Sequence, residues 1–325
     1  MTANTRELVK KLQPLIALVV MVVALSLLSN NFLTFANQRN ILLQISVNVC
    51  LSIGMTLIIL TGGIDLSVGS VLALAGAVTA GLLKSGLELK AFGVVLQFTP
   101  FGAIVGGILV GFALGLLNGI IITRLKVPPF VTTLGTLGIA RGLTMLWTDG
   151  HPITNLGPAF GFIGVGTWLG VPMPVWISIG LVVLFYILSR NTTLGRYIYA
   201  VGGNQKATAF SGVNVNRVKL WAYALGGALA AVAGMIITAR LDTADPKAGL
   251  GYELDSIAAV VIGGTSLSGG RGSVLLTVIG CLIIGVLNNG LFLLDVSAYW
   301  QLVIKGLVLI AAVAVDKMGS RAEES

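Results

Sequence analysis

Residues 41–60 read ILLQISVNVCLSIGMTLIIL and residues 66–83 read LSVGSVLALAGAVTAGLL, and between them stand only the letters TGGID. Each run is almost wholly apolar and, as a helix rising 1.5 Å per residue, is close to the length needed to cross a bilayer core about 30 Å thick. The short interruption carries two glycines and one acid, Asp65. This stretch therefore predicts two membrane-spanning helices joined by a glycine turn.

The rest of the chain repeats this character. Of its 325 residues, 56% are hydrophobic and only 10% are charged, whereas a soluble domain carries about 25% charged residues. Further apolar windows lie at 14–30, 101–123, 130–147, 175–189, 218–239, 253–264, 273–292 and 299–315. We therefore predict an all-α, polytopic membrane protein with about ten transmembrane helices, in which residues 1–325 form a single transmembrane domain.

The basic residues indicate the orientation of these helices. If the N-terminus is inside, one side holds Arg6, Lys10, Lys11, Arg124, Lys126, Arg190, Arg196, Lys206, Arg217, Lys219, Arg271, Lys317 and Arg321. The other side holds Arg39, Lys84, Lys90, Arg240 and Lys247, and the apolar windows themselves contain Arg141 and Lys305. An excess of Lys and Arg marks the cytoplasmic side. Both termini are expected in the cytoplasm, and the +8 net charge indicates topology and no nucleic-acid partner.

Residues 190–219 form the longest and most basic of the predicted cytoplasmic segments. Asn204 can cap a short helix of about two turns, and Gly212 can end it in a left-handed conformation. The small side chains of Ala207 and Ala209 suit a helix that lies in the groove of a protein partner. The alternative is a basic loop that touches anionic lipid headgroups.

The glycine turn has an echo near the C-terminus. Residues 62–69 and 263–270 share the pattern GGxxLSxG, and Leu-Asn-Gly at 117–119 is echoed by Leu-Asn-Asn-Gly at 287–290. Matching glycine breaks in two halves of a transporter point to its translocation path. We expect two related halves. Their relative orientation stays open, because window 253–264 is short for a full crossing.

Chemistry on the chain itself is not indicated. The glycine-rich run 263–273 lacks the GxxxxGK[ST] of a phosphate-binding loop. His151 stands alone near Asp149, without the further ligands that a metal needs. Cys50 and Cys281 lie inside apolar windows, so we expect no disulfide. The sequence predicts no catalytic residue, no cofactor and no metal site.

The spans offer neutral hydrogen-bonding groups in place of fixed charges, which suits a neutral, polyhydroxyl solute. Asp65 is the one candidate for ion coupling, although its position before an apolar window favours shaping the turn or capping the helix. The candidate residues for a translocation path are Asp65, Ser67, Asn118, Ser268, Asn288 and Asn289.

Several strings resemble, over nearly the whole length, the permease subunits of ATP-binding-cassette (ABC) importers for ribose and related simple sugars. They are GMTL at 54–57, LTGGIDLSVGS at 60–70, LGRYIYA at 194–200, GGN at 202–204, SGVN at 211–214 and VVIGGTSL at 260–267. LNNGL at 287–291 and VSAYWQ at 296–301 are most similar to the ribose branch, from which Phe292 and Asp295 depart mildly.

This resemblance implies a complex in a bacterial inner membrane. Two permease copies would pair, a cytoplasmic ATPase would dock beneath them, and an external sugar-binding protein would deliver the solute. The resemblance assigns coupling to the ATPase to residues of the segment 190–219, namely Gly195, Asn204, Ala207, Ser211 and Gly212. The alternatives are an ion-coupled secondary carrier and a passive facilitator, either of which would move sugar without an ATPase.

Overall fold

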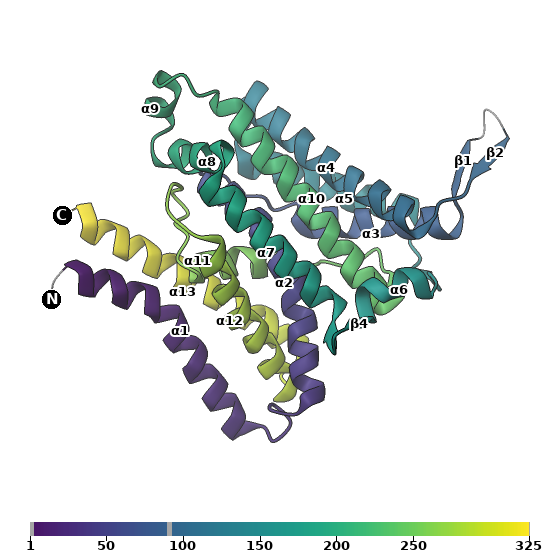
Figure 1. The fold of residues 1–325 in the computed structure, drawn as a ribbon, viewed down its shortest axis with the longest axis horizontal. Coiled ribbons are helices and arrows are strands. Elements are labelled where there is room, and N and C mark those ends of the chain that lie inside the picture. Colours follow the sequence, from purple (N-terminus) through teal and green to yellow (C-terminus); the bar gives the residue numbers. More distant parts are fainter. Residues whose placement is uncertain (1–2, 90–92, 325) are drawn as a thin grey trace.

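The computed structural model describes residues 3–89 and 93–324, and helices dominate it (Figure 1). Each apolar window of the sequence is occupied by one helix. These helices are α1 (Ala3–Leu28), α2 (Phe35–Leu60), α3 (Val68–Lys84), α4 (Pro100–Arg124), α5 (Pro129–Trp147), α7 (Met173–Asn191), α10 (Val215–Leu241), α11 (Tyr252–Ile262), α12 (Val274–Leu293) and α13 (Ala298–Glu324). Among the described residues, α2, α4, α7, α10 and α12 are long and apolar enough to cross a membrane. The chain is thus a helical, multi-pass membrane protein.

The connections contain smaller elements. Three short helices are α6 (Pro158–Val165), α8 (Thr193–Gly203) and α9 (Gln205–Phe210). The strands form three antiparallel pairs: β1 (Leu87–Leu89) with β2 (Val94–Leu96), β3 (Ile153–Thr154) with β6 (Thr243–Ala244), and β4 (Thr167–Trp168) with β5 (Val171–Pro172). The β1–β2 hairpin projects from the helical body (Figure 1). The strand pairs connect helix ends and do not form a core.

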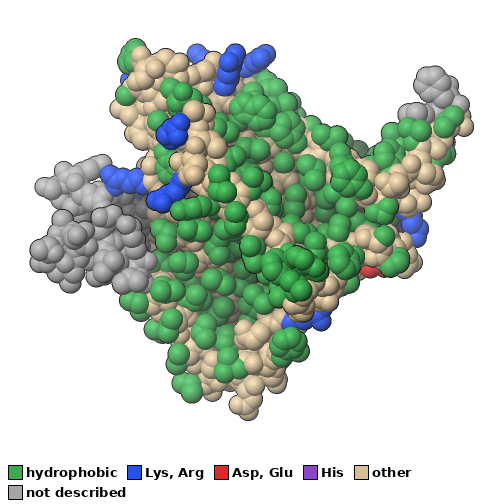
Figure 2. Space-filling model, viewed as in Figure 1, with side chains coloured by type: hydrophobic (Ala, Val, Ile, Leu, Met, Phe, Trp, Pro, Cys, Tyr) green, Lys and Arg blue, Asp and Glu red, His purple; other side chains and the backbone are tan. Residues whose placement is uncertain are grey.

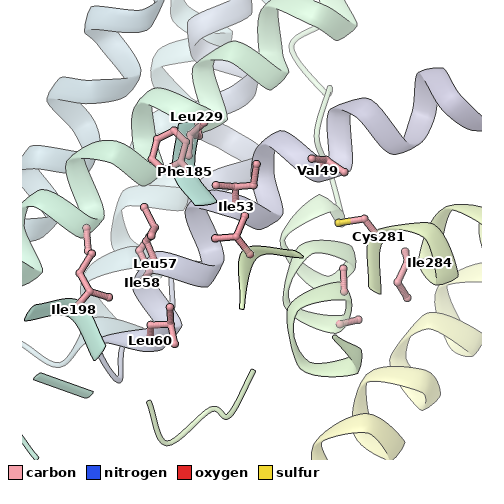
Figure 3. Packing of buried hydrophobic residues seen from close by; sticks show 14 of the residues in the cluster. Val49, Ile53, Leu57, Ile58, Leu60, Phe185, Ile198, Leu229, Cys281 and Ile284 are labelled. Atoms are coloured by element: carbon pink, nitrogen blue, oxygen red, sulfur yellow. The ribbon is translucent and has the colours of Figure 1, made fainter. Parts of the chain in front are cut away.

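Helix α2 lies at the centre of the molecule. It is apolar on all sides and its apolar window is 89% buried, as expected for a helix enclosed by other helices. Ile53, Leu57 and Ile58 pack there against residues of α7, α8, α10 and α12 (Figure 3). Cys50 and Cys281 are buried and free.

Close glycine contacts hold α4 against α10. A methyl group on Gly111 would overlap Gly227 O, one on Gly115 would overlap Tyr223 O, and one on Gly119 would lie 2.8 Å from Leu220 Cα. The repeat of glycine at every fourth position therefore serves backbone-to-backbone packing, as small-residue repeats do in membranes.

Helix α5 has a polar inner face and an apolar outer face. Its buried side chains are Thr132, Thr133, Thr136, Ala140 and Thr144. Its exposed large side chains are apolar and include Phe130, Val131, Leu134, Ile139, Leu143 and Leu146. A soluble helix has the opposite arrangement. The outer face of α5 therefore suits a lipid environment.

The start of α1, the end of α13, and α8 and α9 all lie toward the left side of the molecule in Figure 1, with α9 uppermost. Lys and Arg side chains gather over the α8–α9 part of that side (Figure 2). The orientation predicted from the sequence also used five basic residues that cannot be placed here. Lys90 lies outside the described residues, and the side chains of Arg6, Lys10, Lys11 and Arg321 are not described.

Candidate translocation and coupling sites

Asp65 shapes the turn between α2 and α3. Its side chain is 1% exposed, and its Oδ1 atom accepts hydrogen bonds from Ser67 N at 2.8 Å and from Ser67 Oγ at 2.6 Å. Ser67, one residue before α3, occupies the N-cap position, and no side chain caps α3 there. The sequence favoured two roles for Asp65, shaping the turn and capping the helix. The bonds to Ser67 agree with the first, whereas capping of α3 by Asp65 is not observed.

A chain of buried polar side chains continues from this turn. Asn118 Nδ2 on α4 donates to Ser67 Oγ at 3.1 Å, and Thr136 Oγ1 on α5 donates to Asn118 Oδ1 at 2.5 Å. Asp65, Ser67, Asn118 and Thr136, here called the polar chain, are at most 2% exposed. The structure thus unites three candidates from the first half. Sequence reasoning missed Thr136, although the spacing of Thr132, Thr136 and Thr144 by four and eight residues was a signal of one polar helix face.

A second polar cluster joins α11, α12 and α13. Lys305 Nζ lies 2.9 Å from Asp255 Oδ2, and Asn288 Nδ2 donates to the same oxygen at 3.2 Å. Both charged side chains are largely buried, 19% and 4% exposed. The expectation that the spans contain no buried charge is therefore wrong. An ionisable group inside a membrane helix is costly alone and pairs with an opposite charge. Lys305, within an apolar window, was the signal for such a partner.

The other candidates of the second half lie apart from this cluster. Asn289 and Asn37 exchange two amide hydrogen bonds, of 3.0 and 2.8 Å, and both are buried. This pair ties the end of α12 to the start of α2. Ser268 is exposed in the loop after α11. The six candidate path residues are thus divided among the polar chain, the α11–α13 cluster, a helix–helix link and an exposed loop.

The short helix predicted between Asn204 and Gly212 is present as α9. Asn204 Oδ1 accepts from Ala207 N at 2.9 Å, which caps the helix, and Gly212 has φ +83° just beyond its end. Both local predictions are confirmed. Ser211 Oγ closes onto Ala207 O at 3.0 Å. Gly195 lies at the start of α8 instead, where a methyl group would overlap carbonyl oxygens at the end of α7.

One exposed aromatic side chain marks the coupling segment and was not among the site residues. Phe210, the last residue of α9, is 91% exposed. Beside α9 lies an open groove of about 590 Å³, lined by Gln205, Lys206, Ala209, Asn214, Val215 and Asn216. Lys219 Nζ donates to Gln205 Oε1 at 2.9 Å and ties α9 to α10. This end presents a projecting aromatic ring and a groove, which suits contact with another protein.

Comparison with known proteins identifies the family. Residues 37–313 match the family model described as branched-chain amino acid transport system / permease component. The ribose import permease protein RbsC of Bacillus subtilis (strain 168) is 48% identical over 313 residues, which cover 96% of this chain and 94% of that protein. RbsC of Escherichia coli (strain K12) is 49% identical over 318 residues, covering 96% and 95%. The D-allose transport system permease protein AlsC of the same strain is 42% identical over 299 residues, covering 91% and 88%.

No solved structure matches the chain. The family match covers most of the helical body, from the start of α2 into α13. Members of this family are the non-catalytic permease subunits of ABC importers, in which the ATPase is a separate subunit. The chain belongs to the branched-chain amino acid transport system / permease component family of ABC importer permeases.

Proposed function

We propose that this chain moves ribose, or a closely related simple sugar, into the cytoplasm as the membrane-spanning subunit of an ABC importer. The observation that carries the proposal is that sequence identity to this chain is highest for ribose permeases and lower for permeases of other sugars. Ribose import permeases are 48–49% identical over at least 93% of the chain, the D-allose permease is 42% identical, and the L-arabinose permease AraH is 36% identical. Family membership also leaves no basis for the ion-coupled carrier.

Reconstitution with ABC partners tests the substrate. The chain, an ATPase subunit and one sugar-binding protein at a time would be placed in liposomes, and ATP hydrolysis and sugar uptake measured. Ribose-loaded binding protein should stimulate both activities more strongly than allose-loaded or arabinose-loaded binding protein. Stronger stimulation by one of the latter would contradict ribose. Uptake by the purified chain alone would contradict the ABC importer mechanism.

The proposed partners are a cytoplasmic ABC ATPase, an external or periplasmic sugar-binding protein and a second copy of this chain. The ATPase would hold α9 in a groove, since Ala207, Ala209 and Phe210 are exposed there. In this assignment residues 1–325 form one transmembrane permease domain, and the coupling loop spans about 190–219. Mass measurement of the detergent-solubilised complex distinguishes a homodimer of permeases from a mixed pair.

The proposed topology has ten crossings of a bacterial inner membrane and cytoplasmic termini. The ten helices in the ten apolar windows support it, as does the gathering of Lys and Arg at the end that contains α8 and α9 (Figure 2). Helix α11 is the exception in length. Its 11 residues extend about 16 Å at 1.5 Å per residue, roughly half of a bilayer core. It would therefore cross together with the loops at its ends.

The proposed path follows the polar chain in the first half and the α11–α13 cluster in the second. The helices that precede the two echoed turns, α2 and α11, also end with the same hydrogen-bond pattern. Gly62 N and Gly63 N donate to Ile59 O and Ile58 O after α2, and Gly264 N and Thr265 N donate to Val261 O and Val260 O after α11. These shared caps support two related halves. They also align Gly62 with Gly264, one residue away from the pairing suggested by the GGxxLSxG strings.

A further inference from the structure

Three segments that are far apart in the sequence meet at one point of the backbone. Gly270 N, in the loop between α11 and α12, donates to Leu60 O, the last residue of α2, at 3.0 Å. A Cβ on Gly269 would lie 3.1 Å from both Leu60 O and Gly202 Cα. Gly202 is near the end of α8. We call Leu60, Gly202, Gly269 and Gly270 the glycine junction.

Gly202 allows this contact because it has no side chain. A methyl group there would overlap Leu60 O and Gly270 N, whereas a methyl group on the adjacent Gly203 would meet nothing within 4 Å. Glycine within a helix costs about 0.5–1 kcal/mol relative to alanine. At Gly202 the close backbone approach explains why glycine is present, and the junction is packed too tightly for one segment to move without the others.

The junction is attached to the coupling helix on one side. Thr208 Oγ1 on α9 donates to Ala200 O on α8 at 2.8 Å, and Asn204 O accepts from Thr208 as well. Asn204 both ends α8 and caps α9. Through these bonds a displacement of α9 is transferred to α8, and with α8 to Gly202.

On the other side the junction is attached to both echoed turns. Leu60 O leads within five residues to Asp65 and the polar chain, while Gly270 lies in the loop that joins α11 to α12. Tyr199 on α8 makes a second connection, since its hydroxyl donates to Gly272 O at 3.1 Å. A tyrosine hydroxyl is already protonated at neutral pH, and burial raises the pKa of Tyr199 further, so this hydroxyl is a donor.

We propose that the glycine junction transmits the movement of α9 to both echoed turns at once, with Gly202 and Tyr199 as positioning residues for transport. The inference rests on the proposed function, in which an ATPase moves α9. It adds that the two turns respond together, because the end of α8 contacts the end of α2 and the α11–α12 loop at the same place.

The test compares Gly202→Ala with its neighbour Gly203→Ala in the reconstituted complex of permease, ATPase and sugar-binding protein. Sugar molecules taken up per ATP hydrolysed are measured, together with the amount of ATPase that co-purifies. Gly202→Ala should lower uptake per ATP by about 2- to 30-fold, which corresponds to the coupling energies found in contact networks, with ATPase co-purification unchanged. Gly203→Ala should match the unmodified chain in both measurements.

If Gly202→Ala does not fold, a pair of milder substitutions at two tyrosines tests the same proposal. Tyr199→Phe removes only the hydroxyl that reaches Gly272 and should also lower uptake per ATP, whereas the half-exposed Tyr197→Phe should not. Equal coupling in Gly202→Ala and Gly203→Ala, or in Tyr199→Phe and Tyr197→Phe, would overturn the junction's role. A lack of ATP-driven uptake by the unmodified complex would instead overturn the proposed function, and this proposal with it.

Discussion

Asn118 on α4 donates a 3.1 Å hydrogen bond to Ser67 Oγ, although 51 residues separate the two in the chain. Because Asn118 Oδ1 also accepts from Thr136 on α5, one amide connects the turn before α3 with two further helices. Leaving a buried polar group without a hydrogen-bond partner lowers the stability of the fold by more than one hydrogen bond contributes to it. Asn118 is therefore the residue of the polar chain whose replacement is most informative.

We expect Asn118→Leu to lower the free energy of unfolding by about 1–3 kcal/mol, because Thr136 loses its buried acceptor. Thermal unfolding in detergent measures this change, and ribose uptake by the reconstituted complex should fall as well. Leu117→Ala is the matched control, since Leu117 is 42% exposed on the outer face of the same helix. An unfolding temperature equal to that of the unmodified chain would contradict the structural role of the polar chain.

The Lys305–Asp255 pair should behave as a coupled unit. Lys305→Met leaves a buried carboxylate without its cation, which costs about 3–5 kcal/mol. The double variant Lys305→Met with Asp255→Asn should regain most of that loss, because Asn288 can still donate to the new amide oxygen. Unfolding of the two single variants and the double variant in detergent gives the coupling energy. Additive losses would show that the two charges do not interact.

Phe210 should contribute strongly to binding of the ATPase. Burying a phenylalanine side chain contributes about 1.5–3 kcal/mol, so Phe210→Ala should weaken ATPase binding by about 10- to 100-fold. Titration of the ATPase onto the permease in detergent measures the change. Phe101→Ala is the control, since Phe101 is also highly exposed, 76%, but lies at the start of α4. Equal affinities of the two variants would exclude Phe210 from the contact.

The surface of α9 gives a second prediction for the same contact. Ala207→Arg places a large cation on its exposed face and should abolish co-purification of the ATPase, while Ala207→Ser should retain it. Gly212→Val should also abolish co-purification of the ATPase, because a β-branched residue is strained at φ +83° and would distort the backbone after α9. Insertion into the membrane should be unaffected in all three variants. Unchanged co-purification with Ala207→Arg would remove α9 from the ATPase interface.

Cysteine labelling tests the orientation of the chain. Both native cysteines are buried, so an introduced cysteine can be followed with a membrane-impermeant maleimide. Glu88→Cys in the β1–β2 hairpin should react in cells whose outer membrane has been permeabilised. Phe210→Cys should react only after the inner membrane is opened. The reverse pattern would place α8 and α9 outside the cytoplasm.

The sequence predicted the helical class and a helix in each of the ten apolar windows, because long apolar windows have few alternatives in a membrane. Among the described residues, five of these helices are long and apolar enough to cross a membrane. The sequence also predicted α9 with its cap and the left-handed Gly212, since both depend on local chemistry. Contacts between helices that are far apart in the sequence could not be predicted from it. Asp255 stands near the start of window 253–264 and Lys305 lies within window 299–315, and only the packing of α11 against α13 brings them together.

The path candidates show the same limit. Asp65, Ser67 and Asn118 do form one connected group, but Asn289 is bound to Asn37, which no string pattern linked to it. The echo of GGxxLSxG located two turns correctly and yet paired them one residue away from their matching caps. Hydrogen bonds between helices depend on which way each side chain points around its helix and on how the helices are rotated about their axes. A repeated string does not specify this.

Several threonines of α5 satisfy their hydroxyls within their own segment. Thr132, Thr144 and Thr148 each donate to the carbonyl oxygen four residues earlier on their own backbone, at 3.2, 2.7 and 2.9 Å. Their hydroxyls therefore need no partner on α3. Thr136 alone, through Asn118, connects α5 to the polar chain by a side-chain hydrogen bond of this kind among the described residues. Other side chains also attach α5 to its neighbours: Trp147 Nε1 donates to Ala77 O on α3 at 3.0 Å, and Arg141 Nη1 donates to Pro246 O and Ala248 O. A shift of α5 along α3 would have to break bonds that are spread along the helix, so we expect α3 and α5 to move as one body.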